Sequence, residues 1–337
     1  GLSPFSVGFP ARDANLHALV SRQVLVLVDN QFNMSTMPTF QVKYDWYLFG
    51  GLARTVQLHI LPTVLPFYIE HVNVFPKSLA KVETMVRTSL GARTHKGDWL
   101  LRGRFSASSG GTCAGSTKWP VMLHRGDPST HSVKNVRPWL PELPNLHYFT
   151  LALLKNDTSL QVLDCVQVRF GMRVITADHR GFWLNNNTNV KLRGVNRHHF
   201  VDSPVLTYAD MLRDMSMLKR MNANFVRGSH YPQDARFLDL CDVNGILVWE
   251  EVMAWQPRLT DYKRALFMKQ QRSMATEMVR TSANHPSIII YACFNEGSSH
   301  MGHATFAYKD MAKTLRKESR NSRLISYASD KADRDIM

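Results

Sequence analysis

An unbroken apolar run over residues 288–294 ends abruptly in Asn295 and Glu296. The run lacks polar alternation and is rich in isoleucine, which predicts a strand buried on both faces, as in parallel sheets and barrels. Because burying an unpaired carboxylate costs several kcal/mol, we expect Glu296 either in a polar cleft at the end of the strand or against a partner inside. A glutamate that simply ends a strand in solvent is the alternative interpretation of this run alone.

From about residue 174 onward, short apolar segments alternate with longer amphipathic ones, a βα rhythm typical of a parallel sheet or barrel. Thr207 and Asp210 have the spacing of a capping box. Five strands in this phase fit the first part of a (β/α)8 barrel, which usually needs about 250 residues, so about three βα units are expected to be missing. We predict strands over 190–195, 225–226, 246–249, 288–294 and 324–327, and helices over 207–221, 234–243, 262–282 and 308–317.

Residues 1–144 carry β signals instead. Apolar or alternating runs at 24–28, 56–61 and 67–74 are punctuated by Pro, Gly and Asn and show almost no helical period. We therefore expect β-sandwich structure in this half, with a boundary near Pro62. Residues 106–117 are rich in Gly, Ser and Thr, and are predicted to form an exposed loop.

Lys and Arg exceed Asp and Glu by 14 in the 337 residues, a balance that would suit an acidic partner. The basic residues are scattered, with no run of five or more and no zinc-finger spacing, so no nucleic acid is expected as a partner. No apolar stretch approaches the roughly 20 residues of a membrane span, and no signal peptide is recognisable. We therefore expect a soluble chain without a membrane partner, whose compartment the sequence leaves open.

The four cysteines, Cys113, Cys165, Cys241 and Cys293, are far apart and include no CxxC pair. Three of them lie in apolar contexts, so we predict buried free thiols rather than a metal site or a disulfide framework. The sequence calls for no cofactor, and none is expected.

Polar side chains follow each of the first four predicted barrel strands. Catalytic groups of such barrels lie at the carboxyl ends of the strands. A single His or Glu in such a place is more often structural, but four polar strand ends on one face favour a carboxylate-lined pocket. The four strand ends are residues 196–199, residues 227–232, Glu250 with Glu251, and Asn295 with Glu296.

Glycoside cleavage needs two carboxyl groups, one to protonate the departing oxygen and one to attack or to activate water. We expect Glu296 to be the catalytic acid, with Asn295 hydrogen-bonding the 2-hydroxyl of the sugar. His198 and His230 would hold ring hydroxyls. The remaining candidates for substrate binding are Arg227, Tyr231, Glu251 and Trp249.

Four motifs in this order resemble glycoside hydrolase family 2, the β-galactosidase, β-glucuronidase and β-mannosidase group. They are residues 193–198 (RGVNRH), 227–232 (RGSHYP), 245–251 (GILVWEE) and 285–296 (HPSIIIYACFNE). Upstream, residues 45–54 (DWYLFGGLAR) resemble the end of the family's sugar-binding jelly roll. Residues 139–147 (WLPELPNLH) are similar to a segment of its immunoglobulin-like domain, and residues 170–173 (FGMR) to the exit from that domain.

The resemblance implies three parts. Residues 1–62 would be the C-terminal part of the jelly roll, residues 63–173 an immunoglobulin-like β-sandwich, and residues 174–337 the first five strands of a catalytic TIM barrel. It also implies a retaining double displacement with Glu296 as general acid/base. The nucleophile would be a second Glu at a later strand end, for which no residue here matches, so the chain looks cut at both ends. Glu250 or Glu251 as a substitute nucleophile is a remote alternative.

Two departures from the family pattern stand out. His199 occupies the place of a Glu or Asp, and residues 255–257 (WQP) stand where magnesium-dependent β-galactosidases carry Glu-x-His, so no such metal is expected. We expect a β-galactoside or β-glucuronide as the substrate of the complete protein, and leave open a homo-oligomer. The competing hypothesis is a catalytically inactive fragment that acts at most as a carbohydrate-binding or interaction module.

Overall fold

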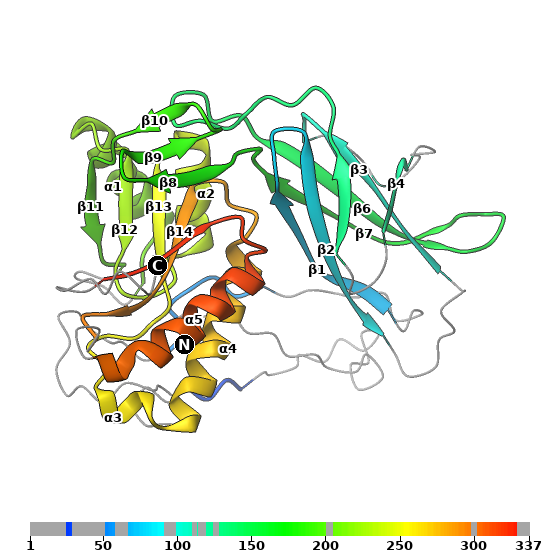
Figure 1. Cartoon of the computed structure of the whole chain (residues 1–337). Helices are drawn as coiled ribbons and strands as arrows, with labels where there is room; N and C mark the ends of the chain where they lie inside the picture. Colours follow the sequence, from blue (N-terminus) through cyan, green and yellow to red (C-terminus); the bar gives the residue numbers. More distant parts are fainter. Residues whose placement is uncertain are drawn as a thin grey trace.

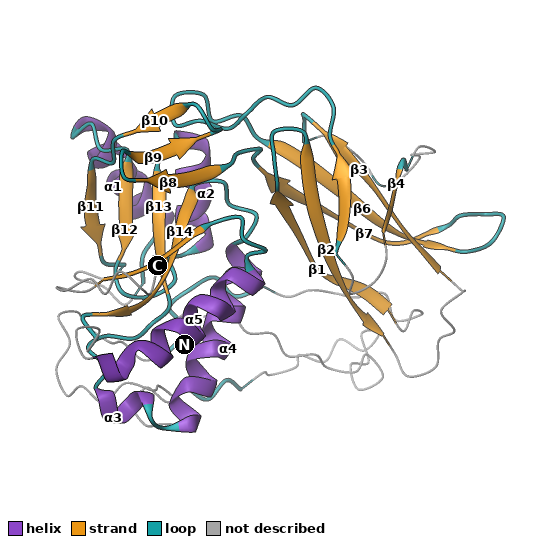
Figure 2. Cartoon of the chain, in the orientation of Figure 1, coloured by secondary structure: helices purple, strands orange, loops and turns teal. Residues whose placement is uncertain are grey.

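The computed structural model describes residues 25–28, 51–57, 67–90, 99–109, 113, 119–123, 128–199, 205–297 and 302–328. Two antiparallel sheets form one side of the molecule, and a parallel sheet with helices forms the other (Figure 1). Every described helix belongs to the second part (Figure 2). The expected jelly-roll segment, residues 1–62, lies outside the described residues except at 25–28 and 51–57, and neither of these stretches is a strand.

The two antiparallel sheets share one hydrophobic core. Val72, Val74 and Val82 on one sheet pack with Phe149 and Leu151 on the other. The predicted strand at 67–74 is confirmed as the first of these strands. One sheet has the order β1 (Phe67–Pro76), β2 (Lys81–Leu90), β5 (Ser129–Ser132), and the other β4 (Val121–Leu123), β3 (Trp99–Ser106), β6 (His147–Lys155), β7 (Val162–Phe170).

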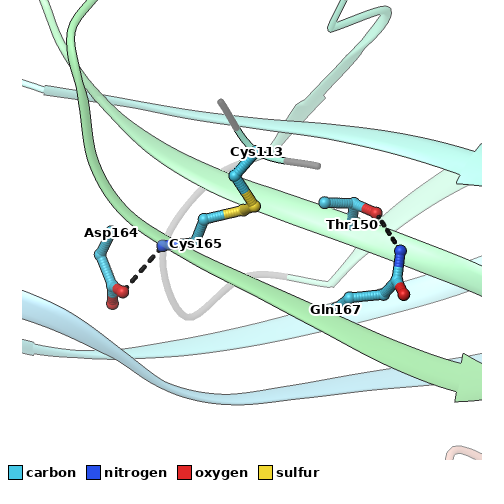
Figure 3. Close-up of a disulfide and its surroundings, with 5 residues drawn as sticks. All are labelled: Cys113, Thr150, Asp164, Cys165 and Gln167. Atoms are coloured by element: carbon cyan, nitrogen blue, oxygen red, sulfur yellow. Dashed lines mark hydrogen bonds between the residues drawn. A yellow bond between two sulfur atoms is a disulfide. The ribbon is translucent and has the colours of Figure 1, made fainter. Parts of the chain in front are cut away.

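A disulfide joins Cys113 to Cys165 on β7 (Figure 3). The prediction of four free thiols is therefore wrong for this pair, although Cys241 and Cys293 are buried and free as expected. The two bonded residues are 52 positions apart in the sequence, and their Cα atoms come within 6.2 Å of each other only through the folding of the sheet. The spacing of the cysteines in the sequence does not predict this pairing.

A small antiparallel sheet, which the sequence did not predict, leads into the barrel. It consists of β8 (Ile175–Asp178), β9 (Gly181–Leu184) and β10 (Thr188–Val190). Ile175 and Leu184 pack against Leu247 and Ile289 near the amino ends of the parallel strands. The predicted strand at 190–195 is therefore split, because the chain ends one sheet at Val190 and starts the next at Gly194.

The parallel sheet confirms the βα rhythm, and its order follows the sequence. Thr207 and Asp210 form the predicted capping box, with the Asp210 amide donating to Thr207 Oγ1 at 3.2 Å. Of the described helices, none combines the length and apolar character that crossing a lipid bilayer requires. The strands are β11 (Gly194–Arg197), β12 (Phe225–Gly228), β13 (Leu247–Glu251), β14 (Ile288–Asn295) and β15 (Leu324–Ala328), and the helices are α1 (Tyr208–Arg220), α2 (Ala235–Asn244), α3 (Leu259–Tyr262), α4 (Ala265–Ser282), η2 (Gly302–Ala304) and α5 (Thr305–Glu318).

Strand β14 contains the apolar run of residues 288–294. Every residue from Ile288 to Asn295 is buried, as predicted. The strand lies between β13 and β15, and its side chains join both the helix-facing core and the core next to the small sheet. Its carboxyl end therefore has a fixed position, because a strand packed on both faces cannot shift without opening the core.

The antiparallel sheets are fixed to the barrel through buried polar contacts. Arg173, fully buried just after β7, donates to the carbonyl oxygens of Pro286 (2.7 Å), Ser322 (3.3 Å) and Ile288. Trp139 Nε1 donates to the carbonyl oxygen of Asp242 at 2.9 Å. Since buried donors and acceptors are costly to leave unpaired, these bonds set how the two parts sit together.

Gly245 ends helix α2 and shows why this position needs glycine. Its φ of 67° lies in the left-handed region, which glycine adopts without steric cost. A side chain here would also collide with the backbone of Pro141, which connects to the antiparallel sheets. The turn from α2 into β13 is therefore fixed from both sides.

Candidate active site

The predicted site residues come together at the carboxyl ends of β11 to β14. His198 directly follows β11, Arg227 lies in β12, and Trp249 is opposite Arg227 in the register of β13. Asn295 is the last residue of β14, and Glu296 follows it. Parallel strands place their carboxyl ends on one edge, so motifs up to about a hundred positions apart meet there.

Arg227 is the centre of the hydrogen-bond network. Its guanidinium binds Glu251 through two bonds, from Nε to Oε1 at 2.8 Å and from Nη2 to Oε2 at 3.1 Å. Nη2 also donates to Asn295 Oδ1 at 2.7 Å. A bidentate pair of this kind is strong and geometrically specific. The arginine thus joins the ends of three neighbouring strands.

Glu251 is almost completely buried, and both of its carboxylate oxygens accept hydrogen bonds. Trp249 Nε1 donates to its Oε1 at 2.6 Å, and His230 Nδ1 lies 3.1 Å from its Oε2. These contacts add to the arginine pair, so the carboxylate is held by several donors. The arrangement identifies Glu251 as an anchor for Arg227 and His230.

His198, His230 and Tyr231 lie together in the site. The rings of His198 and His230 are 5.2 Å apart in an edge-on arrangement. Tyr231 is fully buried; its hydroxyl oxygen accepts from the backbone amide of His199 at 2.8 Å and lies 3.4 Å from His198 Nδ1. Tyr231 therefore holds the chain after β11 in place.

His199, which replaces a carboxylate of the family pattern, is also buried. Burial, followed by the positive charges of Arg54 and Arg197, lowers the pKa of His199 to about 3. The imidazole is therefore neutral at physiological pH. Arg54, from the segment 51–57, donates to the carbonyl oxygen of Pro232 and so reaches this end of the barrel.

Asn295 and Glu296 differ sharply in exposure. Asn295 is 2% exposed, and its Nδ2 is buried without a hydrogen-bond partner among the described residues. Glu296 is exposed, and its carboxylate accepts from Gln256 Nε2 at 2.8 Å. An unpaired buried donor next to an accessible carboxylate is an arrangement that a polar ligand can complete.

The chain leaves β14 in an unusual conformation. Phe294 and Glu296 have φ values of 52° and 51°, in the left-handed region that non-glycine residues rarely adopt. The Phe294 ring is buried among Tyr262, Phe267 and Tyr308, with centroid distances of 4.9, 6.4 and 5.1 Å. Such strain clusters at functional sites and costs on the order of 1–3 kcal/mol per residue, which packing must offset.

The adjacent glutamates of β13 have different environments. Glu251 joins the network at the strand ends, whereas Glu250 is paired in register with Tyr291 on the side that faces the helices. Burial, only partly offset by the charge of His285 and by nearby donors, raises the pKa of Glu250 to about 7. Its Oε2 has no hydrogen-bond partner in the described part of the chain.

One group of side chains has a spacing that could hold a metal ion. The ligand atoms of Asp239, Asp242 and His285 lie within 4.8 Å of one another. Arg169 donates to both aspartates, and His285 Nδ1 lies 2.7 Å from Asp242. His285 precedes β14, so the group lies at the opposite end of this strand from Glu296. It is a contact between the antiparallel sheets and the barrel, already supplied with cationic partners.

Gln256 is a residue of the site that was not among the candidates predicted from the sequence. Residues 255–257 stood out in the sequence only as a departure from a metal-binding pattern, whereas in the structure Gln256 is hydrogen-bonded to Glu296. No motif marks Gln256 as a site residue. The sequence indicated only that it lies five residues beyond Glu251, close to the carboxyl end of a predicted strand.

Comparison with known proteins finds relatives of this chain in one family. Residues 175–337 match the family model for the TIM barrel domain of glycosyl hydrolases family 2. A Formosa agariphila protein provisionally named a β-glucuronidase is 29% identical over 276 residues, which are 81% of this chain and 32% of that protein. A Lactococcus lactis β-galactosidase is 35% identical over 179 residues, 50% of this chain and 17% of that enzyme. The chain thus spans about a third or less of these relatives.

Among solved structures, a family 2 β-galacturonidase from Eisenbergiella tayi bound to glycerol has a TM-score of 0.73 and 26% identity. The likeness covers 90% of this chain and 52% of that structure, so it includes the antiparallel sheets as well as the barrel. The order of the motifs, the parallel sheet and these similarities lead to one conclusion: residues 175–337 belong to the TIM barrel domain of glycosyl hydrolases family 2.

Proposed function

We propose that this chain carries the acid/base side of a retaining β-glycosidase site, with Glu296 as general acid/base. One observation above all supports this role: the exposed Glu296 carboxylate directly follows the buried Asn295, whose Oδ1 is held by Arg227. A catalytic acid must reach the glycosidic oxygen, and a sugar-binding amide must be oriented before the sugar arrives. This pair meets both needs.

The chemistry assigned to the pair has two steps. Glu296 in its protonated form gives its proton to the departing oxygen, and as a carboxylate it then removes a proton from the attacking water. Asn295 Nδ2 donates to the 2-hydroxyl of the sugar, a bond that strengthens as positive charge develops on the ring. His198 and His230 are proposed to contact other ring hydroxyls, and Arg227, Glu251, Trp249 and Tyr231 to keep the set in place.

The second carboxylate is proposed to come from another strand end of the same barrel face. Neither glutamate of β13 suits the role. Both oxygens of Glu251 are engaged by Arg227, so its nucleophilicity is reduced. Glu250 lies on the helix-facing side next to Tyr291.

We propose a β-glucuronide or a β-galactoside as the substrate. The names of the relatives from Formosa agariphila and Eisenbergiella tayi denote uronides, and the excess of 14 basic residues favours an anionic sugar. We also propose that the two antiparallel sheets form an immunoglobulin-like domain over residues 63–173 and that residues 1–62 are the C-terminal part of a jelly-roll domain. Two sheets around one core support the former.

The test compares hydrolysis of aryl β-glucuronide, β-galacturonide, β-galactoside and β-mannoside by the full-length gene product that contains these residues. Glu296→Gln is expected to lower turnover of the preferred phenyl glycoside at least about 100-fold. Glu142→Gln, a change at an exposed carboxylate far along the chain from the site, serves as the control. Equal activity of Glu296→Gln and wild type would refute the role of Glu296. Absence of turnover on every sugar by folded protein would favour a binding module.

A further inference from the structure

The Glu296 carboxylate has a single side-chain partner in the described part of the chain. Gln256 Nε2 donates to its Oε2 at 2.8 Å. Gln256 is half-buried in the segment after β13, whereas Glu296 is exposed. The half-buried Gln256 side chain is held by its surroundings. It therefore fixes the orientation of the exposed Glu296 carboxylate.

The backbone around Gln256 is fixed to the end of β14. The Gln256 amide donates to the carbonyl oxygen of Asn295 at 2.7 Å, and the Asn295 amide donates to that of Ala254 at 2.8 Å. Trp255 and Asn295 are paired as a parallel bridge. The segment thus behaves as a short extension of the sheet, attached next to the proposed acid/base.

Both partners of the hydrogen bond have strained backbones. Gln256 has a φ of 47° and Glu296 a φ of 51°. Each left-handed non-glycine residue costs on the order of 1–3 kcal/mol and persists only where surrounding contacts enforce it. Two such residues lie on either side of one hydrogen bond, so the surrounding contacts hold this arrangement at a cost in stability.

We propose that Gln256 is a positioning residue for Glu296, an inference that rests on the acid/base role proposed above. An amide N–H can only donate, so it binds Oε2 whether or not the carboxyl group is protonated. The proton of the acid form is thereby kept on Oε1. Because the amide is neutral, it orients the carboxyl group without adding charge.

Loss of the Gln256 donor is expected to affect glycosides differently according to their leaving group. Glycosides of poor leaving groups, such as phenol, depend on proton donation, whereas dinitrophenyl glycosides depart without it. Gln256→Met keeps the length and apolar packing of the side chain but removes the donor. It is expected to lower kcat/KM for the phenyl glycoside on the order of 10- to 100-fold, a part of the 100- to 10,000-fold that general acid catalysis supplies, and to leave the dinitrophenyl glycoside nearly unchanged.

A second variant tests the same contact through the pH profile. Gln256→Glu replaces the neutral donor by a second carboxylate, and a like charge favours the protonated form of its neighbour. The basic limb of the pH–rate profile is expected to move to higher pH. Gln161→Met, at an exposed position near the end of the 155–161 turn, is the matched control and should change neither readout.

The outcomes separate this inference from the proposed function. If Glu296→Gln loses phenyl glycoside turnover but both Gln256 variants behave like wild type, Glu296 keeps its role and the inference fails. If Gln256→Met lowers both substrates equally, the role of Gln256 is merely structural and the inference also fails. If Glu296→Gln is as active as wild type, or if the full-length protein hydrolyses no glycoside, the acid/base role and the inference fall together.

Discussion

Replacing Glu250 by glutamine is expected to remove a pH-dependent destabilisation of the fold. Glu250 is 1% exposed in the layer between the barrel strands and the helices, and burial raises its pKa to about 7 from 4.5. Between these two values the native state holds a proton that the unfolded state has released. The free energy of unfolding therefore falls as the pH rises through this window.

The magnitude follows from the two pKa values. The difference between about 7 and 4.5, at about 1.4 kcal/mol per pH unit, amounts to about 3 kcal/mol once Glu250 is fully ionised. Most of this, about 2 to 3 kcal/mol, is lost between about pH 5 and about pH 8. The neutral amide of Glu250→Gln cannot ionise, so relative to wild type this variant should gain stability over the same interval.

Urea unfolding followed by tryptophan fluorescence at about pH 5 and about pH 8 measures the effect. Burial lowers the pKa of His285, but Asp242 and Asp239 outweigh it and the pKa is raised, so His285 also contributes stability at low pH that is lost as the pH rises. Glu250 is itself one of the charges that raise the pKa of His285. The difference between Glu250→Gln and wild type, with Glu142→Gln as control, therefore reports Glu250 together with its coupling to His285. A difference that stays constant with pH would refute the assignment of a buried, readily protonated carboxyl group.

Three further perturbations test other contacts. Arg173→Met removes a donor from the buried carbonyl oxygens of Pro286 and Ile288, whereas the Ser322 carbonyl oxygen keeps Arg323 as a donor. It should lower the free energy of unfolding by about 2 kcal/mol or more in denaturant titration; a loss below about 1 kcal/mol would contradict its role as the connector. Gly297→Ala places a methyl group against the hydroxyls of Tyr262 and Tyr308 and should lower kcat more than about tenfold, with Tyr308→Phe restoring part of it. Cys165→Ala opens a bridge that spans 52 residues and should cost about 4 kcal/mol, measured against wild type with and without reductant.

The sequence by itself determined most helices and strands of the parallel sheet, but neither the small sheet of β8 to β10 nor the division of the predicted helix at 262–282 into α3 and α4. The predicted helices at 207–221 and 234–243 are confirmed as α1 and α2 to within a residue or two, and the run at 288–294 is confirmed as the buried strand β14. These features could be predicted because helical and strand periodicities and capping signals are local properties of the chain. The parallel order of the strands also follows from the βα alternation.

The assembly of the candidate site was predictable only in part. That His198, Arg227, Glu251 and Glu296 would lie on one edge follows from their places at strand ends. Which of them bind each other does not, because hydrogen-bond partners depend on side-chain directions and on the register between strands. The bidentate contact of Arg227 with Glu251 is such a case.

Only the tertiary structure decided the remaining features. It separated Glu250 from Glu251, joined Cys113 to Cys165, and brought Gln256 to Glu296. Each depends on contacts between segments distant in sequence, or on which face of a strand a residue occupies once the strand is packed. A sequence pattern fixes the period of a segment, but the partners of its side chains are set by the packing of the whole chain.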